Sequence, residues 1–360
     1  MRRVKTLIKA IFFSYFVGAP LMAPSYEIET PNLIPRTPND EKGDPDEITL
    51  LFVGDVMMGG RMVEVIRREG VEYPYKESKD ILQSGDLAFC NLEAPFGRGG
   101  KPSQKKYTFL VPPEFGEGLL YAGFDGVSLA NNHTMDYGMT GLLSTLALLD
   151  KKGIHYTGAG RNIEEARTPA IFEVKGVRIA FLSYSRTFPI RFYATPKRGG
   201  TAQGKEEYLM EDIEKAKRSA DLVIVSFHWG GEKEKAPKYY MKELAHLAIQ
   251  EGADCVVGHH PHVVQGIERY QNGIIAYSLG NFAFGSFSEK VSGIIFKIII
   301  TKEGWKRAEV IPLEVNNFKV NLQPKVMEGE SARKELIRIA ELSNPLGTKL
   351  RIEGDVGIIE

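Results

Sequence analysis

The chain has 360 residues, which is long enough to bury a full hydrophobic core in one large domain. Its 46 basic residues balance its 46 acidic ones, and 43% of all residues are hydrophobic. This composition is typical of a globular protein, and the balanced charge argues against a nucleic-acid partner.

The first 23 residues have the pattern of an export signal. Basic residues occur at the start without any acidic one, and an uncharged run from Ala10 to Ala23 follows. A basic segment before a short apolar one is typical of a secretory signal, and this run is shorter than the roughly twenty residues of a spanning helix. Pro20 and Pro24 directly follow the candidate cleavage sites. A cleaved signal peptide, a retained membrane anchor and a plain apolar tail on a cytoplasmic protein all stay open, and we predict an exported, extracytoplasmic chain.

Residues 24–47 are rich in proline and acidic residues and poor in apolar ones, which is typical of an extended linker. The folded part is predicted to begin at Ile48. We expect a main domain over residues 48–314 and a C-terminal extension, residues 315–360, that contains a helix.

Within the main domain, short apolar runs alternate with amphipathic stretches. The runs that are typical of strands cover residues 48–53, 87–90, 127–130, 177–183, 222–227, 255–257 and 274–279. The stretches 141–152 and 238–250 have helical spacing and end at or near a glycine. This alternation predicts an α/β fold with mostly parallel strands and helices on the sheet faces.

The end of the chain has a different pattern. Residues 293–300 and 307–313 are strand-like and are separated by Lys-Glu-Gly-Trp, so they predict a β-hairpin. A charged helix is expected at about residues 331–342.

Polar residues that bind metals or carry protons follow nearly every strand-like run. They are Asp55, Glu93, Asn131, Asn132, His133, Asp136, His228, His259, His260, His262 and Asn281. The carboxyl ends of parallel strands lie along one edge of a sheet, and ligands bind in the crevice outside that edge. Five of the chain's seven histidines belong to this set, so we predict that the set converges on one site.

The chemistry of this set favours divalent metal ions. Carboxylate, amide oxygen and neutral imidazole suit Zn²⁺, Mn²⁺ or Fe²⁺, and one carboxylate can bridge two ions about 4 Å apart. Such ions would acidify water and neutralise charge on a transferring phosphoryl group. These ligands suffice without thiolate. The two cysteines, Cys90 and Cys255, each lie inside an apolar run. Two buried free thiols are the favoured interpretation of this pair, and a disulfide stays open.

Six short motifs resemble those of CapA-type capsule synthesis proteins, a family associated with poly-γ-glutamate production. They are Gly-Asp-Val-Met-Met-Gly (54–59), Asn-Leu-Glu (91–93), Ala-Asn-Asn-His-Thr-Met-Asp-Tyr-Gly (130–138), His-Trp-Gly-Gly-Glu (228–232), Gly-His-His-Pro-His-Val-Val-Gln (258–265) and Tyr-Ser-Leu-Gly-Asn-Phe (277–282). The resemblance covers roughly residues 48–313 in the right order. That family is similar to calcineurin-type metallophosphoesterases, so it implies an α/β sandwich with one or two divalent ions at the strand ends.

The resemblance also implies roles for single residues. The implied metal ligands are Asp55, Glu93, Asn132, His228, His260 and His262. His133 matches a histidine that assists the leaving group or the transition state, and Asp136 is placed with it as a candidate catalytic residue. Asp136 would orient a histidine, or it would cap the helix that begins nearby. Met57 stands where metallophosphoesterases have a ligand histidine, and Glu93 replaces their aspartate, so we expect a weakened second metal site or a single ion.

Three further residues are candidates for binding substrate. Arg61 follows Asp55 closely and would bind an anion, or it is a solvated surface arginine. Glu232 would bind substrate or orient a ligand histidine. Asn281 ends a strand at the predicted site, where it would contact substrate or fix a loop. The segment 186–205 combines basic and aromatic residues, and it is either a lid over the crevice or a surface loop.

From these features we expect a metal-dependent hydrolase or transferase that acts on an anionic cell-surface polymer. Other membrane proteins of capsule synthesis are expected as its partners. One alternative is a phosphoesterase for a small extracytoplasmic phosphoester. The other is a non-catalytic, metal-stabilised accessory for polymer binding or export.

Overall fold

The computed structural model describes residues 46–360. The predicted signal or anchor (1–23) and nearly all of the predicted linker (24–47) lie outside the described residues. Within the described part, no helix combines the length and the apolar character that crossing a membrane requires.

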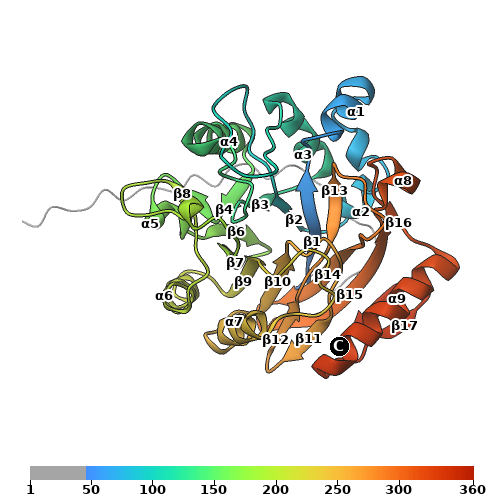
Figure 1. Ribbon diagram of the computed structural model, residues 1–360. Coiled ribbons are helices and arrows are strands. Elements are labelled where there is room, and N and C mark those ends of the chain that lie inside the picture. The colour runs from blue at the N-terminus through green and yellow to red at the C-terminus, as the bar shows by residue number, and fades with distance from the viewer. Residues whose placement is uncertain (1–45) are drawn as a thin grey trace, which may run out of the picture. The chain divides into compact units, whose positions relative to one another are not determined.

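The larger of two main sheets has ten strands, half of them parallel (Figure 1). The parallel group consists of β1 (Ile48–Met57), β2 (Leu87–Leu92), β3 (Gly126–Ser128), β4 (His155–Thr157) and β13 (Asn281–Phe284). Beside β1 lies an antiparallel group formed by β14 (Gly293–Thr301), β15 (Gly304–Glu314), β16 (Lys325–Val326), β18 (Val356–Ile359) and β17 (Arg351–Glu353). Segments that follow residue 315 therefore extend this sheet.

The smaller main sheet has six strands with a parallel centre. Its order is β11 (Ile267–Tyr270), β12 (Gly273–Ala276), β10 (Cys255–His259), β9 (Leu222–His228), β7 (Val177–Ser185) and β6 (Ala170–Val174). The two edge strands are antiparallel to their neighbours. A separate pair is formed by β5 (Ala159–Gly160) and β8 (Gly200–Thr201).

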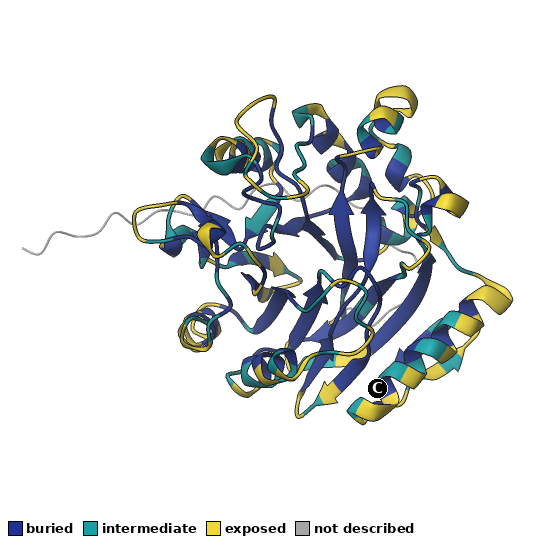
Figure 2. Ribbon diagram, viewed as in Figure 1, coloured by how far each residue is buried: buried dark blue, intermediate teal, exposed yellow. Residues whose placement is uncertain are grey.

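Helices lie outside the sheets, and their outer faces are exposed while the strands are buried (Figure 2). The helices are α1 (Met62–Glu69), α2 (Lys79–Gln83), α3 (Gly116–Ala122), α4 (Gly138–Lys152), α5 (Ile163–Ala166), α6 (Glu206–Lys217), α7 (Tyr239–Gln250), α8 (Asn317–Val320) and α9 (Gly329–Ser343). Short 3₁₀ turns cover Tyr73–Tyr75, Pro113–Phe115, Ile190–Phe192 and Asn344–Leu346.

Alternation along the strands creates separate hydrophobic layers. In β1, Leu50 and Phe52 pack with Phe181 and Ile224 of the smaller sheet, whereas Leu51 faces the layer under α1, α3 and α4. Side chains from the opposite face of the smaller sheet pack with α6 and α7 in a third layer. Because successive strand residues point to opposite faces, each main sheet is covered on both sides.

The predicted α/β fold with parallel strands and flanking helices is confirmed, and so is the C-terminal hairpin, which is formed by β14 and β15. Two strand ends differ from the prediction. The run 127–130 ends as a strand at Ser128, and the run 274–279 ends at Ala276. After each of these points the chain leaves the sheet to form the loops that contain Asn131 and Gly280.

A glycine at the end of β10 fixes how closely the following histidine loop can approach its neighbours. A Cβ atom at Gly258 would lie 1.9 Å from the backbone oxygen of Tyr277 and 2.7 Å from Nε1 of Trp229. We expect Gly258→Ala to lower the free energy of unfolding by about 1–3 kcal/mol, because the backbone itself must move. Urea denaturation would measure this change. Gly99→Ala is the matched control, because a Cβ atom there would meet nothing within 4 Å. Equal midpoints for the two variants would contradict the prediction.

Candidate metal centre

The carboxyl ends of strands from both main sheets bring the predicted polar residues together. Asp55, near the end of β1, is in register with Asn91 of β2 and with Asn281 of β13. In the smaller sheet His228 at the end of β9 is in register with His259 at the end of β10. The strand ends of two sheets therefore form one polar centre.

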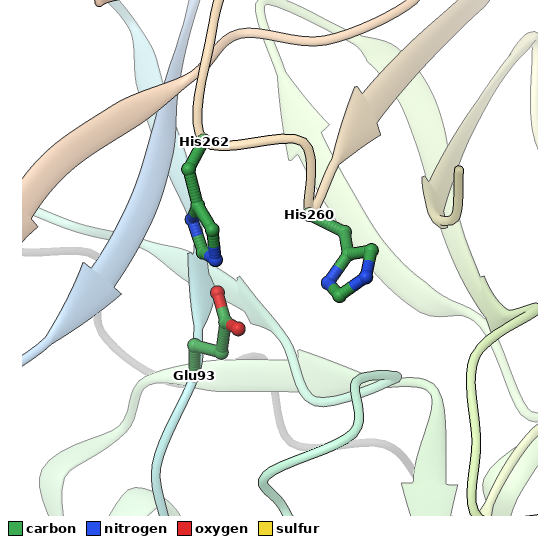
Figure 3. A group of neighbouring side chains, drawn as sticks. All are labelled: Glu93, His260 and His262. Atoms are coloured by element: carbon green, nitrogen blue, oxygen red, sulfur yellow. The ribbon is translucent and has the colours of Figure 1, made fainter. Parts of the chain in front are cut away.

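Two groups of side chains are arranged closely enough to hold a metal ion. One consists of Asp55, Glu93 and His228, and the other of Glu93, His260 and His262. Within each group the candidate ligand atoms all lie within 4.8 Å of one another. Figure 3 shows Glu93 and His262 facing each other, with His260 beside them. Glu93 is common to both groups, as expected for a carboxylate that bridges two ions.

Asp55 is fully buried and is surrounded by hydrogen-bond donors. Its Oδ1 accepts a hydrogen bond from Asn91 Nδ2 at 2.8 Å, and its Oδ2 lies 3.1 Å from His262 Nδ1. Burial opposes ionisation, but hydrogen bonds and electrostatic interactions with His259 and His262 outweigh it and hold the pKa of this carboxyl well below its usual value. Asp55 is therefore preorganised as an anion.

Glu93 is also fully buried, but it lacks comparable compensation. Its Oε1 has no hydrogen-bond partner among the described residues, although it lies 3.6 Å from His228 Nε2. Burial and the nearby charge of Asp55 raise the pKa of Glu93 well above its usual value. A buried carboxylate beside a second carboxylate needs a cation, and a metal ion between them would supply it.

His228 lies beside this carboxylate and also contacts Asn132. The Nε2 atom of His228 lies 2.8 Å from Oδ1 of Asn132. Burial and the neighbouring His260 lower the pKa of His228 well below its usual value, so its ring is neutral. Neutral imidazole and amide oxygen are both metal ligands, so Asn132 extends the first ligand group.

The loop after β10 presents His260 and His262 in an uncommon backbone conformation. Their φ angles are 94° and 56°, in the region that bulky residues rarely adopt. Such strain is typical of sites where the surrounding structure fixes a functional side chain. The Oδ1 atom of Asn281 lies 2.8 Å from His262 Nδ1 and orients the ring, which leaves its Nε2 available as a ligand. Burial lowers the pKa of His260 to about 3, so this ring is neutral too.

His133 lies at the edge of the ligand groups with its own supporting residues. Its Nδ1 is 2.7 Å from Asp136 Oδ2, and its Nε2 is 4.0 Å from Glu93 Oε1. Burial lowers the pKa of His133, while Asp136 opposes this by stabilising the imidazolium. Asp136 does not cap helix α4, whose N-cap is Tyr137; its carboxylate instead accepts a hydrogen bond from the backbone N–H of Phe109. The arrangement points Nε2 of His133 toward the ligand groups.

Two residues that support the site, Asn91 and Lys105, escaped the sequence analysis, whereas Asn131 belongs to the predicted set. Asn91 Nδ2 contacts Asp55, Glu93 and His228 at 2.8, 3.3 and 3.2 Å, and Asn131 Nδ2 donates to Oδ1 of Asn91 at 3.0 Å. Lys105 forms an ion pair with Asp136 at 2.6 Å and donates to the backbone oxygen of Asn132. Asn91 lies on β2 two residues before Glu93, which follows the end of that strand, so the sequence signals that it is near Glu93 but not what it contacts. Lys105 comes from an irregular loop that offers no such signal.

Residues from the predicted set fit divalent metal ions. Buried atoms without a hydrogen-bond partner among the described residues include Glu93 Oε1 and His260 Nδ1. Such atoms are rare in folded proteins unless an ion or water satisfies them. Carboxylate, amide and imidazole ligands without thiolate suit Zn²⁺, Mn²⁺ or Fe²⁺. Both cysteines, Cys90 and Cys255, are buried free thiols on separate sheets.

Two residues near the ligand groups, Met57 and His259, are not themselves in either group. Met57 is fully buried, and its sulfur accepts a weak hydrogen bond from the backbone N–H of Gly59. His259 lies with its Nδ1 3.4 Å from Asp55 Oδ1, and it belongs to neither ligand group. This location agrees with a supporting role for His259.

Of the three remaining candidates, two are exposed and one contacts a ligand histidine. Arg61 is exposed, and its guanidinium lies over the ring of Phe287 at 5.2 Å. Glu232 is exposed, and no hydrogen bond or ion pair joins it to a histidine in the described part of the chain. Its charge nevertheless contributes to the raised pKa of Glu93. Asn281 is buried and contacts His262, which places it as a support for that histidine.

Comparison with known proteins finds a family and two relatives that are named for capsule or PGA synthesis. Residues 49–286, more than half of the chain, match the family described as bacterial capsule synthesis protein PGA_cap. The capsule biosynthesis protein CapA of Bacillus anthracis is 32% identical over 279 residues, covering 75% of this chain and 68% of that protein. The PGA biosynthesis protein CapA of Bacillus subtilis is 31% identical over 285 residues, covering 78% of this chain and 75% of that protein.

Among solved structures, the NAD nucleotidase of Haemophilus influenzae is similar with a TM-score of 0.48 and 12% identity. That match covers 82% of this chain and only 56% of the nucleotidase. The calcineurin-like phosphoesterase YfkN of Bacillus subtilis matches with a TM-score of 0.40 and 15% identity, over 72% of this chain and 87% of that one. The extent of the family match and the identity to its relatives establish that this chain belongs to the bacterial capsule synthesis protein family.

Proposed function

We propose that this protein is a metal-dependent hydrolase or transferase that acts on an anionic cell-surface polymer. The observation that carries the proposal is the convergence of Asp55, Glu93 and His228 with His260 and His262 around a shared carboxylate. Two of its relatives carry the names capsule biosynthesis protein and PGA biosynthesis protein, which favours a surface polymer as the substrate.

The proposed division of labour follows from the contacts. Asp55, Glu93, Asn132, His228, His260 and His262 would hold one or two divalent ions. When bound, the ions would neutralise negative charge on the substrate and act as Lewis acids. His133 would move a proton at Nε2, with Asp136 fixing its other nitrogen at 2.7 Å. Lys105 would hold Asp136 in place.

A metal assay on the purified full-length chain tests this proposal. We expect near-stoichiometric Mn, Zn or Fe by elemental analysis, and hydrolysis of an aryl phosphate that stops after chelation and returns with added metal. A chain that retains no metal and turns nothing over, even after reconstitution with Mn²⁺ or Zn²⁺, would overturn it. That outcome would favour a non-catalytic polymer-binding accessory, for which buried Met57 in place of a ligand histidine is the supporting observation. Turnover of the aryl phosphate but of no polymer would favour a small-phosphoester enzyme.

The proposal places the enzyme outside the cytoplasm. It rests on the basic and apolar pattern of residues 1–23, which lie outside the described residues, and on the capsule-related names of the relatives. The test is added protease on cells whose outer layers have been opened while the cytoplasmic membrane stays intact. The protease should digest the protein. Protection until the membrane is lysed would contradict export.

A further inference from the structure

A cleft of about 570 Å³ lies beside the metal centre. Asn132 and His260, both in the proposed ligand set, form part of its lining. The other lining residues come from the segment 186–203 and from residues 230–240 before and within the first turn of α7. The segment that the sequence suggested as a lid therefore borders the crevice. A molecule in this cleft would contact the metal ligands directly.

Charge in the cleft has one sign. Its lining includes Arg186 and Lys238, and no aspartate or glutamate from the described part of the chain lines it. Arg186 is exposed, and it forms no ion pair with another described residue. Lys238 is paired with Glu234 at 3.0 Å, an exposed pair of low strength. Of the two cations, Arg186 is therefore the one without a carboxylate partner among the described residues.

The position of Arg186 is restrained. Its guanidinium lies 5.7 Å from the ring centroid of Tyr240, and its side-chain methylenes lie where Gly204 leaves room, 3.1 Å from the position of a Cβ atom there. An arginine held against an aromatic ring loses less entropy when it binds a carboxylate in a bidentate manner.

Apolar surface completes the lining. Phe188 is 77% exposed and Ile190 is 64% exposed, and both border the cleft. Large exposed apolar side chains next to a cleft are typical of a binding surface. Together with Arg186 they match a carboxylate that is attached to an aliphatic segment.

A neighbouring cleft of about 440 Å³ limits how far an anion can extend. It shares Arg186 and Tyr240 with the first cleft, but Glu206, Glu207 and Glu243 are also in its lining. Like charges repel, so an anionic chain is held in the first cleft and excluded from the second.

We propose that the cleft beside the metal centre binds an aliphatic carboxylate of the substrate chain, and that Arg186 is the residue that binds it. This inference rests on the proposed function and adds to it. The site would hold a repeat unit of the polymer next to the bond that reacts. Binding itself requires neither metal nor turnover, so it is testable separately.

The test is the affinity of the metal-stripped full-length chain for a fluorescein-labelled, γ-linked glutamate oligomer, measured by fluorescence anisotropy. Arg186→Gln is expected to raise Kd about tenfold, as for the loss of one charged hydrogen-bonded contact. Lys205→Gln is the matched control: it removes the same charge from the neighbouring cleft, where Lys205 pairs with Glu207, and is expected to change Kd less than about twofold. An uncharged γ-linked isoglutamine oligomer, in which an amide replaces each free α-carboxylate, is expected to bind weakly to all three proteins.

The outcomes separate the two proposals. Equal losses in the two variants would show an effect of overall charge alone and would overturn the role of Arg186. Absence of binding to the unaltered chain would overturn the carboxylate site, whatever the aryl phosphate assay shows. Arg186-dependent binding without any metal-dependent turnover would support the site and count against the proposed enzymatic function.

Discussion

Replacement of Asp55 by asparagine is expected to remove most of the bound metal from the purified chain. Asp55 is fully buried, and His259 and His262 hold the pKa of its carboxyl well below its usual value despite burial. The variant keeps the size of the side chain but removes the negative charge on which a divalent ion depends. Loss of a single supporting residue around a metal typically costs about 10- to 100-fold in affinity, so loss of a ligand should cost at least about 100-fold. Elemental analysis and titration with Zn²⁺ or Mn²⁺ measure the change.

Two controls make this result specific. Asp80→Asn removes the same charge from an exposed position in the first turn of α2 and should leave the metal content unchanged. A thermal melt of Asp55→Asn without metal shows whether the variant is folded. If the folded variant binds metal with unchanged stoichiometry and affinity, the assignment of the first ligand group is wrong.

Stability should follow metal content. A ligand that binds only the folded state stabilises it by about 2.7 kcal/mol at a hundredfold excess over Kd. We therefore expect added metal to raise the melting temperature of the unaltered chain but not that of Asp55→Asn.

Much of this fold was predictable because its strands are buried on both faces. Runs such as Leu222–His228 and Val177–Ser185 are largely apolar, and His228 at the end of the first is conspicuous. The division into two sheets was not predictable from these runs. Phe52 packs against Phe181 of the other sheet, at a ring distance of 6.5 Å, and nothing in either segment specifies that pairing.

Within the candidate site, residues at strand ends were predictable and those from loops were not. Asp55 and His228 follow apolar runs, so each could be placed at the carboxyl edge of a sheet, although the meeting of the two edges depends on how the sheets pack. Lys105 reaches Asp136 from an irregular loop, where no periodicity constrains the path of the chain. The positive φ angles of His260 and His262 depend equally on tertiary contacts, because neither residue favours that conformation alone.

Roles of buried amides were also hidden from sequence. Asn91 lies between Leu92 and Cys90 in a strand in which every residue is buried, and a strand-based prediction treats it as an interruption. Its amide nitrogen lies within hydrogen-bonding distance of two carboxylates and one imidazole. Such a contact set is visible only once the strands are placed side by side.

Replacement of His133 by alanine should abolish turnover and leave the metal in place. His133 belongs to neither of the two ligand groups, and its Nε2 stays 4.0 Å from Glu93. Loss of a general acid or base typically lowers a rate by about 10²- to 10⁴-fold. We expect a loss of that size in kcat for the aryl phosphate, with metal content equal to that of the unaltered chain.

The Asp136→Asn variant distinguishes proton transfer at His133 from a purely structural role. Asp136 holds Nδ1 of His133 and favours the imidazolium, so its neutral replacement should shift the pH profile of kcat toward lower pH. The sign follows because loss of the stabilising charge lowers the folded pKa of the imidazole further. His155→Asn, at a histidine on β4 that packs against Phe172, is the control and should leave both rate and profile unchanged. Full activity in His133→Ala would exclude this residue from catalysis. An unshifted profile in Asp136→Asn would leave Asp136 as a support for the loop of Phe109 alone, since its contact with that backbone N–H would then be its main role.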